Sequence, residues 1–288
     1  MNHNACIMRC LELSLSDAAA NLALDEALLE EAEAAGVPLE TLRLWEFSGP
    51  VVVVGRSSQV EAEVHVNVCR QSGIPILRRV SGGAAVIAGP GCLMYSLVLS
   101  YQHRPALRLV GEAHRAVLGR LVAGLSGSVA GVAFRGTSDL AIDASKSGPG
   151  NGSFFGLQPC TAQLAKRAEK NEPVPGRENW DSPRERFLKF SGNSVRCRRT
   201  HLLYHGTLLY DFPLPLIERC LKMPSRVPDY RGGRGHAAFV TNLAVTAESL
   251  RRGLMAAWDA GTPRSDWPRK LTEQLACAKY RLTEWNGL

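Results

Sequence analysis

The sequence predicts an α+β (α/β) fold in which sheets are layered against helices. Short apolar strands and helical segments follow one another along most of the 288 residues. Several neighbouring strands are joined by tight turns, which argues against a purely parallel sheet because parallel strands need long crossover connections. Apolar residues make up 45% and charged residues 21% of the chain, so its composition is that of a globular protein rather than a disordered or fibrous one.

The first half of the chain is expected to begin with a helix. Ser16 or Asp17 can cap this helix, and Gly36 and Pro38 end it after about Ala35. The segments expected next are a strand over Thr41–Phe47, a buried strand over Val51–Val54 that forms a hairpin with it, a helix over Val60–Ser72, and strands over Ile74–Val80, Val86–Ile87 and Leu93–Tyr101.

The second half is expected to contain hairpins and further helices. The expected segments are a helix over Ala106–Leu125, short strands over Val132–Phe134 and Asp139–Ile142, a hairpin of Leu188–Val195 with Leu202–Asp211, and helices over Thr246–Asp259 and Pro268–Lys279. A stretch rich in Gly, Pro and Ser indicates a long insertion at about 144–187. We therefore expect one domain over residues 1–288, with this insertion and a C-terminal helical tail at about 246–288.

Charge and cysteine usage narrow the class of protein. Lys and Arg number 34 against 27 Asp and Glu, and the net charge of +7 favours anionic ligands or acidic partners. Aromatic residues are only 7% of the chain, so we expect no nucleic-acid partner. No apolar run reaches the roughly 18–20 residues that cross a bilayer, so no membrane association is expected. The eight cysteines form no Cys-x-x-Cys pair, which indicates reduced thiols in a cytoplasmic protein and argues against a closed zinc site.

A pair of arginines runs into a glycine turn at Arg78–Gly83. Glycine lets backbone N–H groups approach an anion closely, and arginine offers a planar fork for phosphate or carboxylate oxygens. This pattern is typical of a nucleotide or acyl-phosphate site, although an ordinary β-turn with surface arginines has the same composition. It is not a Walker motif, which requires a Gly-Lys pair followed by Ser or Thr.

Three further residues are candidates for chemistry. Lys189 precedes a small-residue turn and can place an ammonium group against developing negative charge, or it can lie at a strand edge in solvent. His205 lies in an apolar strand and can contact a substrate or serve as a core histidine. Asp139 can hold Mg²⁺, accept a hydrogen bond from a nucleophile, or be a plain turn residue. The basic clusters Arg196–Arg199 and Arg231–Arg234 are interpreted as solvated turns or a docking patch for an acidic protein.

Six motifs occur in a fixed order along residues 16–245. They are Asn21–Glu26, Val52–Gln59, Arg78–Gly83, Ser138–Leu140, Lys189–Ser194 and His205–Leu209. Each motif alone is weak, but the six together resemble the lipoate–protein ligase A family, within the biotin/lipoate ligase and octanoyltransferase superfamily. The resemblance implies a biotin/lipoate ligase-like catalytic domain with mixed, mostly antiparallel sheets flanked by helices.

The resemblance also implies an activity and its partners. Lipoate and ATP, with Mg²⁺, would form lipoyl-adenylate and pyrophosphate. The lipoyl group would then pass to a lysine of an acidic acceptor domain, as in the E2 subunit of a 2-oxoacid dehydrogenase or the H protein of glycine cleavage. The positive surface of this chain suits such an acceptor.

The family's residue roles carry over to matching positions. Lys189 matches the family lysine that contacts the lipoyl carbonyl and the α-phosphate, and Asp139 matches an aspartate near the reacting phosphate that can hold Mg²⁺. His205 matches a histidine that supports the pocket. The ATP and lipoate site would comprise Arg78, Arg79, Ser81, Gly82, Gly83, Ala84, Ala85, Val86, Ile87, Lys189, Ser191, Gly192, His205, Gly206 and Thr207.

The chain departs from the family pattern in three places. The family has a third glycine and then an aromatic-His-Asp sequence where this chain has Ala84–Gly89. The insertion at about 144–187 separates Asp139 from Lys189, where the family has a short turn. The sequence ends at Leu288, near the point where the bacterial ligase's small accessory domain would begin. We therefore expect that a separate accessory subunit completes the enzyme.

Two other functions remain open. An octanoyltransferase would move octanoate from acyl carrier protein through a cysteine thioester. Cys160 is the first residue to test for that role and Cys220 the second, although neither lies in the sequence context that transferases use. The altered glycine turn also fits a non-catalytic member that binds lipoyl-adenylate or a lipoyl domain.

Overall fold

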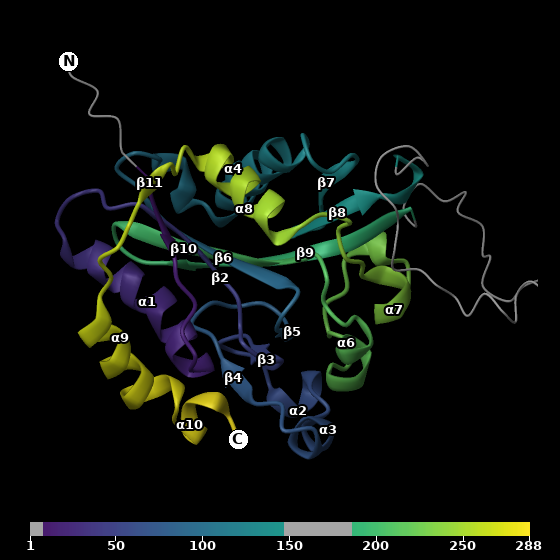
Figure 1. Cartoon of the computed structure of the whole chain (residues 1–288). Coiled ribbons are helices and arrows are strands. Elements are labelled where there is room, and N and C mark those ends of the chain that lie inside the picture. The colour runs from purple at the N-terminus through teal and green to yellow at the C-terminus, as the bar shows by residue number, and fades with distance from the viewer. Residues whose placement is uncertain (1–7, 147–185) are drawn as a thin grey trace, which may run out of the picture.

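An eight-stranded sheet forms the centre of the computed structural model, which describes residues 8–146 and 186–288 (Figure 1). Its strands in spatial order are β11 (Thr262–Pro263), β1 (Arg9–Glu12), β2 (Thr41–Trp45), β6 (Cys92–Ser100), β10 (His201–Leu209), β9 (Phe187–Cys197), β8 (Asp139–Asp143) and β7 (Val132–Arg135). β1 pairs in parallel with both of its neighbours, and all other neighbours in this sheet are antiparallel. The prediction of a mixed, mostly antiparallel sheet is confirmed.

A smaller sheet of three strands lies beside the large one. It has the order β4 (Ile76–Arg78), β3 (Val51–Val54) and β5 (Val86–Ala88). β3 pairs in parallel with β4 and antiparallel with β5. The loop between β4 and β5 contains the predicted arginine–glycine turn, so this sheet carries one wall of the candidate site.

Helices cover both faces of the large sheet (Figure 1). They are α1 (Ala18–Ala34), α2 (Val60–Glu63), α3 (Val66–Gln71), α4 (Val110–Leu125), α6 (Pro215–Cys220), α7 (His236–Phe239), α8 (Ala247–Trp258), α9 (Arg269–Leu275) and α10 (Thr283–Asn286). α4 and α8 lie on one face, and α1, α9 and the small sheet lie on the other. Within the described residues, none of these helices is both long enough and apolar enough to span a membrane.

The helices α1 and α8 begin at capping side chains, of which the sequence analysis predicted that of α1. The Asp17 carboxylate accepts a hydrogen bond from the backbone N–H of Ala19 at 2.9 Å, and the Thr246 hydroxyl accepts one from Ser249. After α1 the chain turns at Gly36, whose φ of +70° lies in the left-handed region that glycine enters without strain. The predicted helices over the α1 and α8 segments are therefore confirmed.

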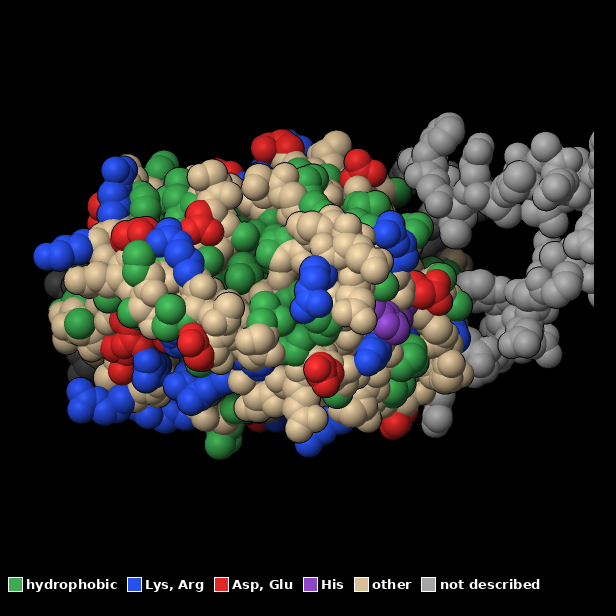
Figure 2. Space-filling model, turned by 90° about the horizontal axis from the view of Figure 1, so that it is seen from below, with side chains coloured by type: hydrophobic (Ala, Val, Ile, Leu, Met, Phe, Trp, Pro, Cys, Tyr) green, Lys and Arg blue, Asp and Glu red, His purple; other side chains and the backbone are tan. Residues whose placement is uncertain are grey.

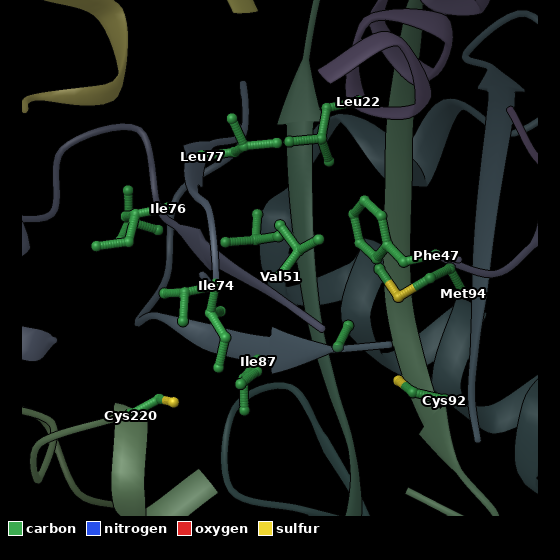
Figure 3. Close-up of a cluster of buried hydrophobic side chains, with 14 of the residues drawn as sticks. Leu22, Phe47, Val51, Ile74, Ile76, Leu77, Ile87, Cys92, Met94 and Cys220 are labelled. Atoms are coloured by element: carbon green, nitrogen blue, oxygen red, sulfur yellow. The ribbon is translucent and has the colours of Figure 1, made fainter. Parts of the chain in front are cut away.

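Two apolar clusters hold the layers together. One contains residues of both sheets and of the helices beside the small sheet, and includes Val51, Ile76, Ile87 and Met94, which are labelled in Figure 3. The other lies between the large sheet and the helices α4 and α8. All nine residues of β6 are buried, because this strand is central in the sheet and both of its faces are covered.

One predicted hairpin is wrong. The strands over Thr41–Phe47 and Val51–Val54 do not pair, because β2 lies in the large sheet and β3 in the small one. All four residues of β3 are buried, and the strand takes partners on both sides from β4 and β5. The turn at residues 48–50 therefore carries the chain from one sheet to the other.

The helix after β3 and two short strands also differ from the prediction. The predicted helix over Val60–Ser72 is divided into α2 and α3, because Val64 between them forms a β-bridge with Leu221. The strands β1 and β11 were not predicted. The predicted insertion at about 144–187 lies almost entirely outside the described residues.

Candidate active site

A cavity of about 490 Å³ lies between the two sheets and the segment that contains α6 and α7. The predicted site residues that line it are Arg79, Gly83, Ala84, Ala85, Val86, Ile87, Asp139, Lys189, Gly192, His205, Gly206 and Thr207. The predicted residues that do not line it are Arg78, Ser81, Gly82 and Ser191. The cavity thus brings together residues from motifs that are far apart in the sequence.

Lys189 and Asp139 form an ion pair at the cavity. The Lys189 Nζ atom lies 2.7 Å from Oδ1 of Asp139, and the two side chains are 28% and 10% exposed. An ammonium group that is held by one carboxylate and still partly accessible can stabilise negative charge on a bound substrate.

The local fold of β9 explains why these two side chains meet. Asp139 on β8 pairs with Gly192 on β9, and a bulge after Leu140 shifts the register so that Ala141 pairs with Lys189. A Cβ atom on Gly192 would lie only 3.3 Å from Nζ of Lys189. The glycine therefore leaves room for the ammonium group beside the strand.

Arg79 holds the glycine turn in shape. Its guanidinium donates hydrogen bonds to the carbonyl oxygens of Gly82 at 2.5 Å, Ala84 at 3.0 Å and Val53 at 3.1 Å, and to the Ser81 hydroxyl at 3.1 Å. Burial lowers the pKa of the Arg79 guanidinium to about 10, although the Glu63 carboxylate acts in the opposite direction. Arg79 thus supplies positive charge to the cavity from a fixed position.

The turn packs closely against its neighbours on both sides. Gly83 has a φ of +88°. A Cβ atom on Gly55 would lie 2.0 Å from the Gly83 carbonyl oxygen, which no side chain could occupy. From the other side, the Ser194 hydroxyl of β9 donates a hydrogen bond to the Gly82 carbonyl at 2.8 Å. The Ser-Gly-Gly turn is therefore fixed between the two sheets.

Glu63 reaches the turn where this chain lacks the family's third glycine. Its Oε2 accepts a hydrogen bond from the backbone N–H of Ala85 at 2.5 Å, and Glu63 lines the cavity. The sequence analysis did not identify Glu63. Its position in a short helical segment, 22 residues from its partner, gave no local sign of this contact.

Arg78 turns away from the cavity toward the C-terminal segment. Its guanidinium donates hydrogen bonds to the carbonyl oxygens of Gly55 and Trp285, both at 2.7 Å, and of Ser58 at 2.8 Å. Its backbone N–H donates to the Asn286 side chain at 2.8 Å. Arg78 therefore joins the loop after β3 to α10, and these contacts are those of a structural residue.

His205 belongs to a buried chain of polar groups, two of which, His205 and Asp25, line the cavity. Its Nε2 lies 2.5 Å from the Ser81 hydroxyl, and its Nδ1 lies 3.4 Å from Oδ2 of Asp25. Asp25 also forms an ion pair with Arg43 at 2.7 Å and accepts a hydrogen bond from Ser96. Burial alone would raise the pKa of the Asp25 carboxyl, but the Arg43 guanidinium, His205 and Ser96 outweigh it and hold the pKa below its ordinary value of 3.8.

Tyr230 is a second residue that the sequence analysis missed. Its hydroxyl donates a hydrogen bond to Oδ2 of Asp139 at 2.9 Å. It lies in a 3-10 turn, Asp229–Arg231, which adjoins the basic cluster Arg231–Arg234. Arg231 is only 3% exposed and lines the cavity, because its side chain packs over Phe239 and donates a hydrogen bond to the Arg234 carbonyl. The interpretation of Arg231–Arg234 as a solvated cluster is therefore wrong for Arg231.

One face of the molecule carries both signs of charge. On the face seen in Figure 2, Lys and Arg side chains are spread out, with Asp and Glu side chains among them. The net charge of +7 is therefore not held on this face in a single basic patch.

The described cysteines lie outside the cavity. None of Cys10, Cys69, Cys92, Cys197, Cys220 and Cys277 is among the residues that line it. Cys220 is fully buried in the core between the sheets (Figure 3). Cys160 lies outside the described residues.

The described residues do not form a Mg²⁺ site of their own. Both carboxylate oxygens of Asp139 already accept bonds, one from Lys189 and one from Tyr230. No group of three or more His, Cys, Asp or Glu side chains in the described parts of the chain could hold a metal ion. The Lys189 ammonium group occupies the position beside Asp139 that a cation would need.

The sequence matches relatives over nearly its full length. Residues 17–251 match the model of the lipoyl protein ligase A/B catalytic domain. The octanoyltransferase LipM of Geobacillus kaustophilus is 25% identical over 294 residues, which cover 97% of this chain and 98% of the relative. The LipM of Kyrpidia tusciae is 28% identical and covers 96% and 97%. A putative lipoate–protein ligase A of Aeropyrum pernix is 39% identical over 79 residues, which are 27% of this chain and 29% of the relative.

Solved structures share the fold. A bipartite lipoate protein ligase of Thermoplasma acidophilum, solved in a study of that ligase and its E2 lipoyl domain, has a TM-score of 0.70 at 18% identity, and the match covers 97% of this chain and 96% of that one. A lipoate–protein ligase A bound with ATP has a TM-score of 0.68 at 18% identity and covers 97% and 98%. The family model spans most of the sequence and the fold agrees with it, so this chain belongs to the lipoyl protein ligase A/B catalytic domain family.

Proposed function

We propose that this protein joins a medium-chain acyl group, lipoyl or octanoyl, to a lysine of an acceptor lipoyl domain, and that it activates the acid with ATP as an acyl-adenylate. The observation that carries the proposal is the Lys189 ammonium group. It lies at a cavity that has apolar walls and a second cationic group, Arg79. Family membership supports the class of reaction, and the adenylate route is the part of the proposal that the experiment must decide.

The cavity has a part for each portion of such a substrate. Leu22, Val53, Met94 and Leu209 offer apolar surface to an acyl chain. Lys189 and Arg79 place two cationic groups at the same cavity, where a carboxylate and a phosphate must meet.

The proposed reaction has two steps. In the first, an oxygen of the acid attacks the α-phosphorus of ATP, and the bond to the β-phosphate breaks, so that pyrophosphate leaves. In the second, the neutral amine of the acceptor lysine attacks the acyl carbon, AMP leaves with the bonding electron pair, and the amine proton passes to solvent. Negative charge grows on the α-phosphate in the first step and on the acyl oxygen in the second. The fixed ammonium group of Lys189 would stabilise both without losing its proton.

A second candidate is a cysteine-dependent octanoyltransferase. The observation that favours it is the match to LipM octanoyltransferases over more than nine-tenths of both chains. A cysteine thiolate would attack the octanoyl thioester of acyl carrier protein and release the carrier thiol. The acceptor lysine would then attack the new thioester and free the cysteine. Among the cysteines considered for this role, Cys220 is buried away from the cavity, and Cys160 lies outside the described residues.

One set of assays separates the two routes. The protein is mixed with an apo lipoyl domain and either lipoate with ATP, octanoate with ATP, or octanoyl acyl carrier protein without ATP. The adenylate route predicts that the domain gains acyl mass only with ATP, together with pyrophosphate release. Acylation without ATP, with an adduct on a cysteine that the Cys160→Ala or Cys220→Ala variant abolishes, would establish the transferase instead. No acylation of the domain under any of the three conditions would overturn both.

A further inference from the structure

We propose that Tyr230 is a positioning residue that holds the Asp139–Lys189 pair in place for acyl transfer. The inference rests on the proposed function, because it assigns Tyr230 to the reaction that Lys189 serves. The two oxygens of the Asp139 carboxylate have different partners. Oδ1 faces Lys189 Nζ at 2.7 Å, and Oδ2 accepts the Tyr230 hydroxyl at 2.9 Å.

A carboxylate bonded on both sides has little freedom to rotate. If Oδ2 had no partner, Asp139 could turn about its side-chain bonds, and the ammonium group that follows Oδ1 would move with it. Lysine itself is flexible, since its long side chain has four rotatable bonds and many rotamers to choose from. The phenol therefore restricts the ammonium group through the carboxylate between them.

Tyr230 is itself held firmly. Its side chain is buried, with the residue 7% exposed, and its ring packs against Phe239 with the ring centroids 5.1 Å apart. The Arg234 guanidinium donates a hydrogen bond to the Tyr230 carbonyl at 2.8 Å and another to the Phe187 carbonyl at 3.1 Å. This ties the 3-10 turn to the first residue of β9, the strand that carries Lys189. The phenol and the ammonium group are thus fixed to one framework.

The same segment also forms a wall of the cavity. Pro228, Arg231 and Phe239, which flank Tyr230, all line it. A substrate that contacts this wall lies next to the hydrogen bond between Tyr230 and Asp139. Removing the hydroxyl should therefore disturb the position of the ammonium group more than it disturbs the binding of the acyl chain.

The molecule contains a matched control for this contact. Glu26 accepts from Lys279 on both oxygens, at 2.9 and 2.8 Å, and from the Tyr280 hydroxyl on Oε2 at 2.7 Å, so it also joins a lysine, a carboxylate and a phenol, but the lysine holds both oxygens. None of these three residues lines the cavity. Tyr230→Phe and Tyr280→Phe each remove one buried phenol–carboxylate bond, but only the first removes it at the cavity.

The first test is a kinetic comparison of the two variants. For Tyr230→Phe we expect kcat for acylation of the lipoyl domain to fall about tenfold or more, because small misplacements of a reacting group cost rates of this order. The KM for the acyl substrate should stay within about twofold, since the apolar walls are intact. Tyr280→Phe should keep the kcat of the natural protein, while its melting temperature falls about as much as that of Tyr230→Phe. A Lys189→Ala background should abolish the effect of Tyr230→Phe. An unchanged kcat in Tyr230→Phe, or an equal loss in Tyr280→Phe, would overturn the proposal.

The second test does not depend on catalysis. Isotope-labelled lysine gives NMR signals for the ammonium groups of Lys189 and Lys279 when they are held in ordered ion pairs. We expect Tyr230→Phe to broaden or remove the Lys189 signal and to leave that of Lys279, and Tyr280→Phe to leave the Lys189 signal unchanged. A Lys189 signal that is unchanged in Tyr230→Phe would refute the clamp. If the natural protein acylates no lipoyl domain, the proposed function fails, and the NMR comparison still decides whether Tyr230 positions Lys189.

Discussion

The ammonium group of Lys189 and the carboxylate of Asp139 lie 2.7 Å apart, on neighbouring strands at the edge of one cavity. The two residues are 50 positions apart in the sequence, and the predicted insertion lies between them. The antiparallel pairing of β8 with β9 brings them together, and a bulge in that pairing turns both side chains to the same place. Lys189 thus lies at the cavity where the proposed reaction would develop negative charge on a substrate.

Arg78 should matter more for stability than for substrate binding. Its guanidinium joins Gly55 and Ser58 to Trp285, and its residue is 8% exposed. Replacing it by alanine leaves several buried carbonyl groups without a donor, so we expect Arg78→Ala to lower the free energy of unfolding by about 2–4 kcal/mol. Urea unfolding measures this change. A stability equal to that of the natural protein, together with a strongly raised KM for ATP, would show that Arg78 binds the nucleotide instead.

Gly55 should tolerate no side chain. A Cβ atom there would lie 2.0 Å from the Gly83 carbonyl oxygen, which is backbone and can move only with the whole turn. We expect Gly55→Ala to lower stability by about 1–3 kcal/mol and to reduce acyl transfer as well. Gly49→Ala is the control, because nothing lies within 4 Å of the position of its Cβ atom. Equal melting temperatures and activities for both variants would contradict this account of the turn.

The buried His114 should make the protein less stable in mild acid. Burial lowers the pKa of the His114 imidazole below its ordinary value of 6.5, so the unfolded chain takes up a proton at this residue before the folded one does. Its contribution to stability is fully present above a pH of about 6.5 and is lost as the pH falls through the lower folded pKa.

The His114→Gln variant tests this dependence. Glutamine can keep a hydrogen bond to the Tyr204 hydroxyl, which lies 2.8 Å from Nδ1 of His114, but it does not titrate. We expect the urea midpoint of the natural protein to fall more between pH 8 and pH 5 than that of the variant. Burial also lowers the pKa of His201 and His236, so the variant should keep part of the slope. Parallel pH profiles for the two proteins would count against the assignment to His114.

The sequence predicts those parts of the fold that have a local cause. The helix over Ala18–Ala34 has a capping residue before it and a glycine after it, and the hairpin of β9 with β10 has alternating strands on both sides of a short basic turn. β1 has four residues and no turn nearby, and it exists because β2 and β11 pair with it. Such a strand cannot be recognised from its own residues.

The site was predictable in outline and not in its contacts. Arg78 and Arg79 are adjacent at the end of a strand, where successive side chains point to opposite sides, and the sequence does not say which one faces the cavity. Tyr230 meets Asp139 across 91 residues, and Glu63 meets Ala85 through a carboxylate that resembles any surface acid. Many of the predicted residues line one cavity, while tertiary pairing decides which further residues contact them.

The most direct test of the central claim is the rate at which Lys189→Ala acylates an apo lipoyl domain with saturating acid and ATP, beside Lys270→Ala as an exposed control. Removing one fixed charge contact should lower the rate at least about a hundredfold, while the melting temperature and the control stay close to those of the natural protein. A Lys189→Ala variant that transfers the acyl group at nearly the natural rate would contradict the assignment of this ammonium group to the reaction.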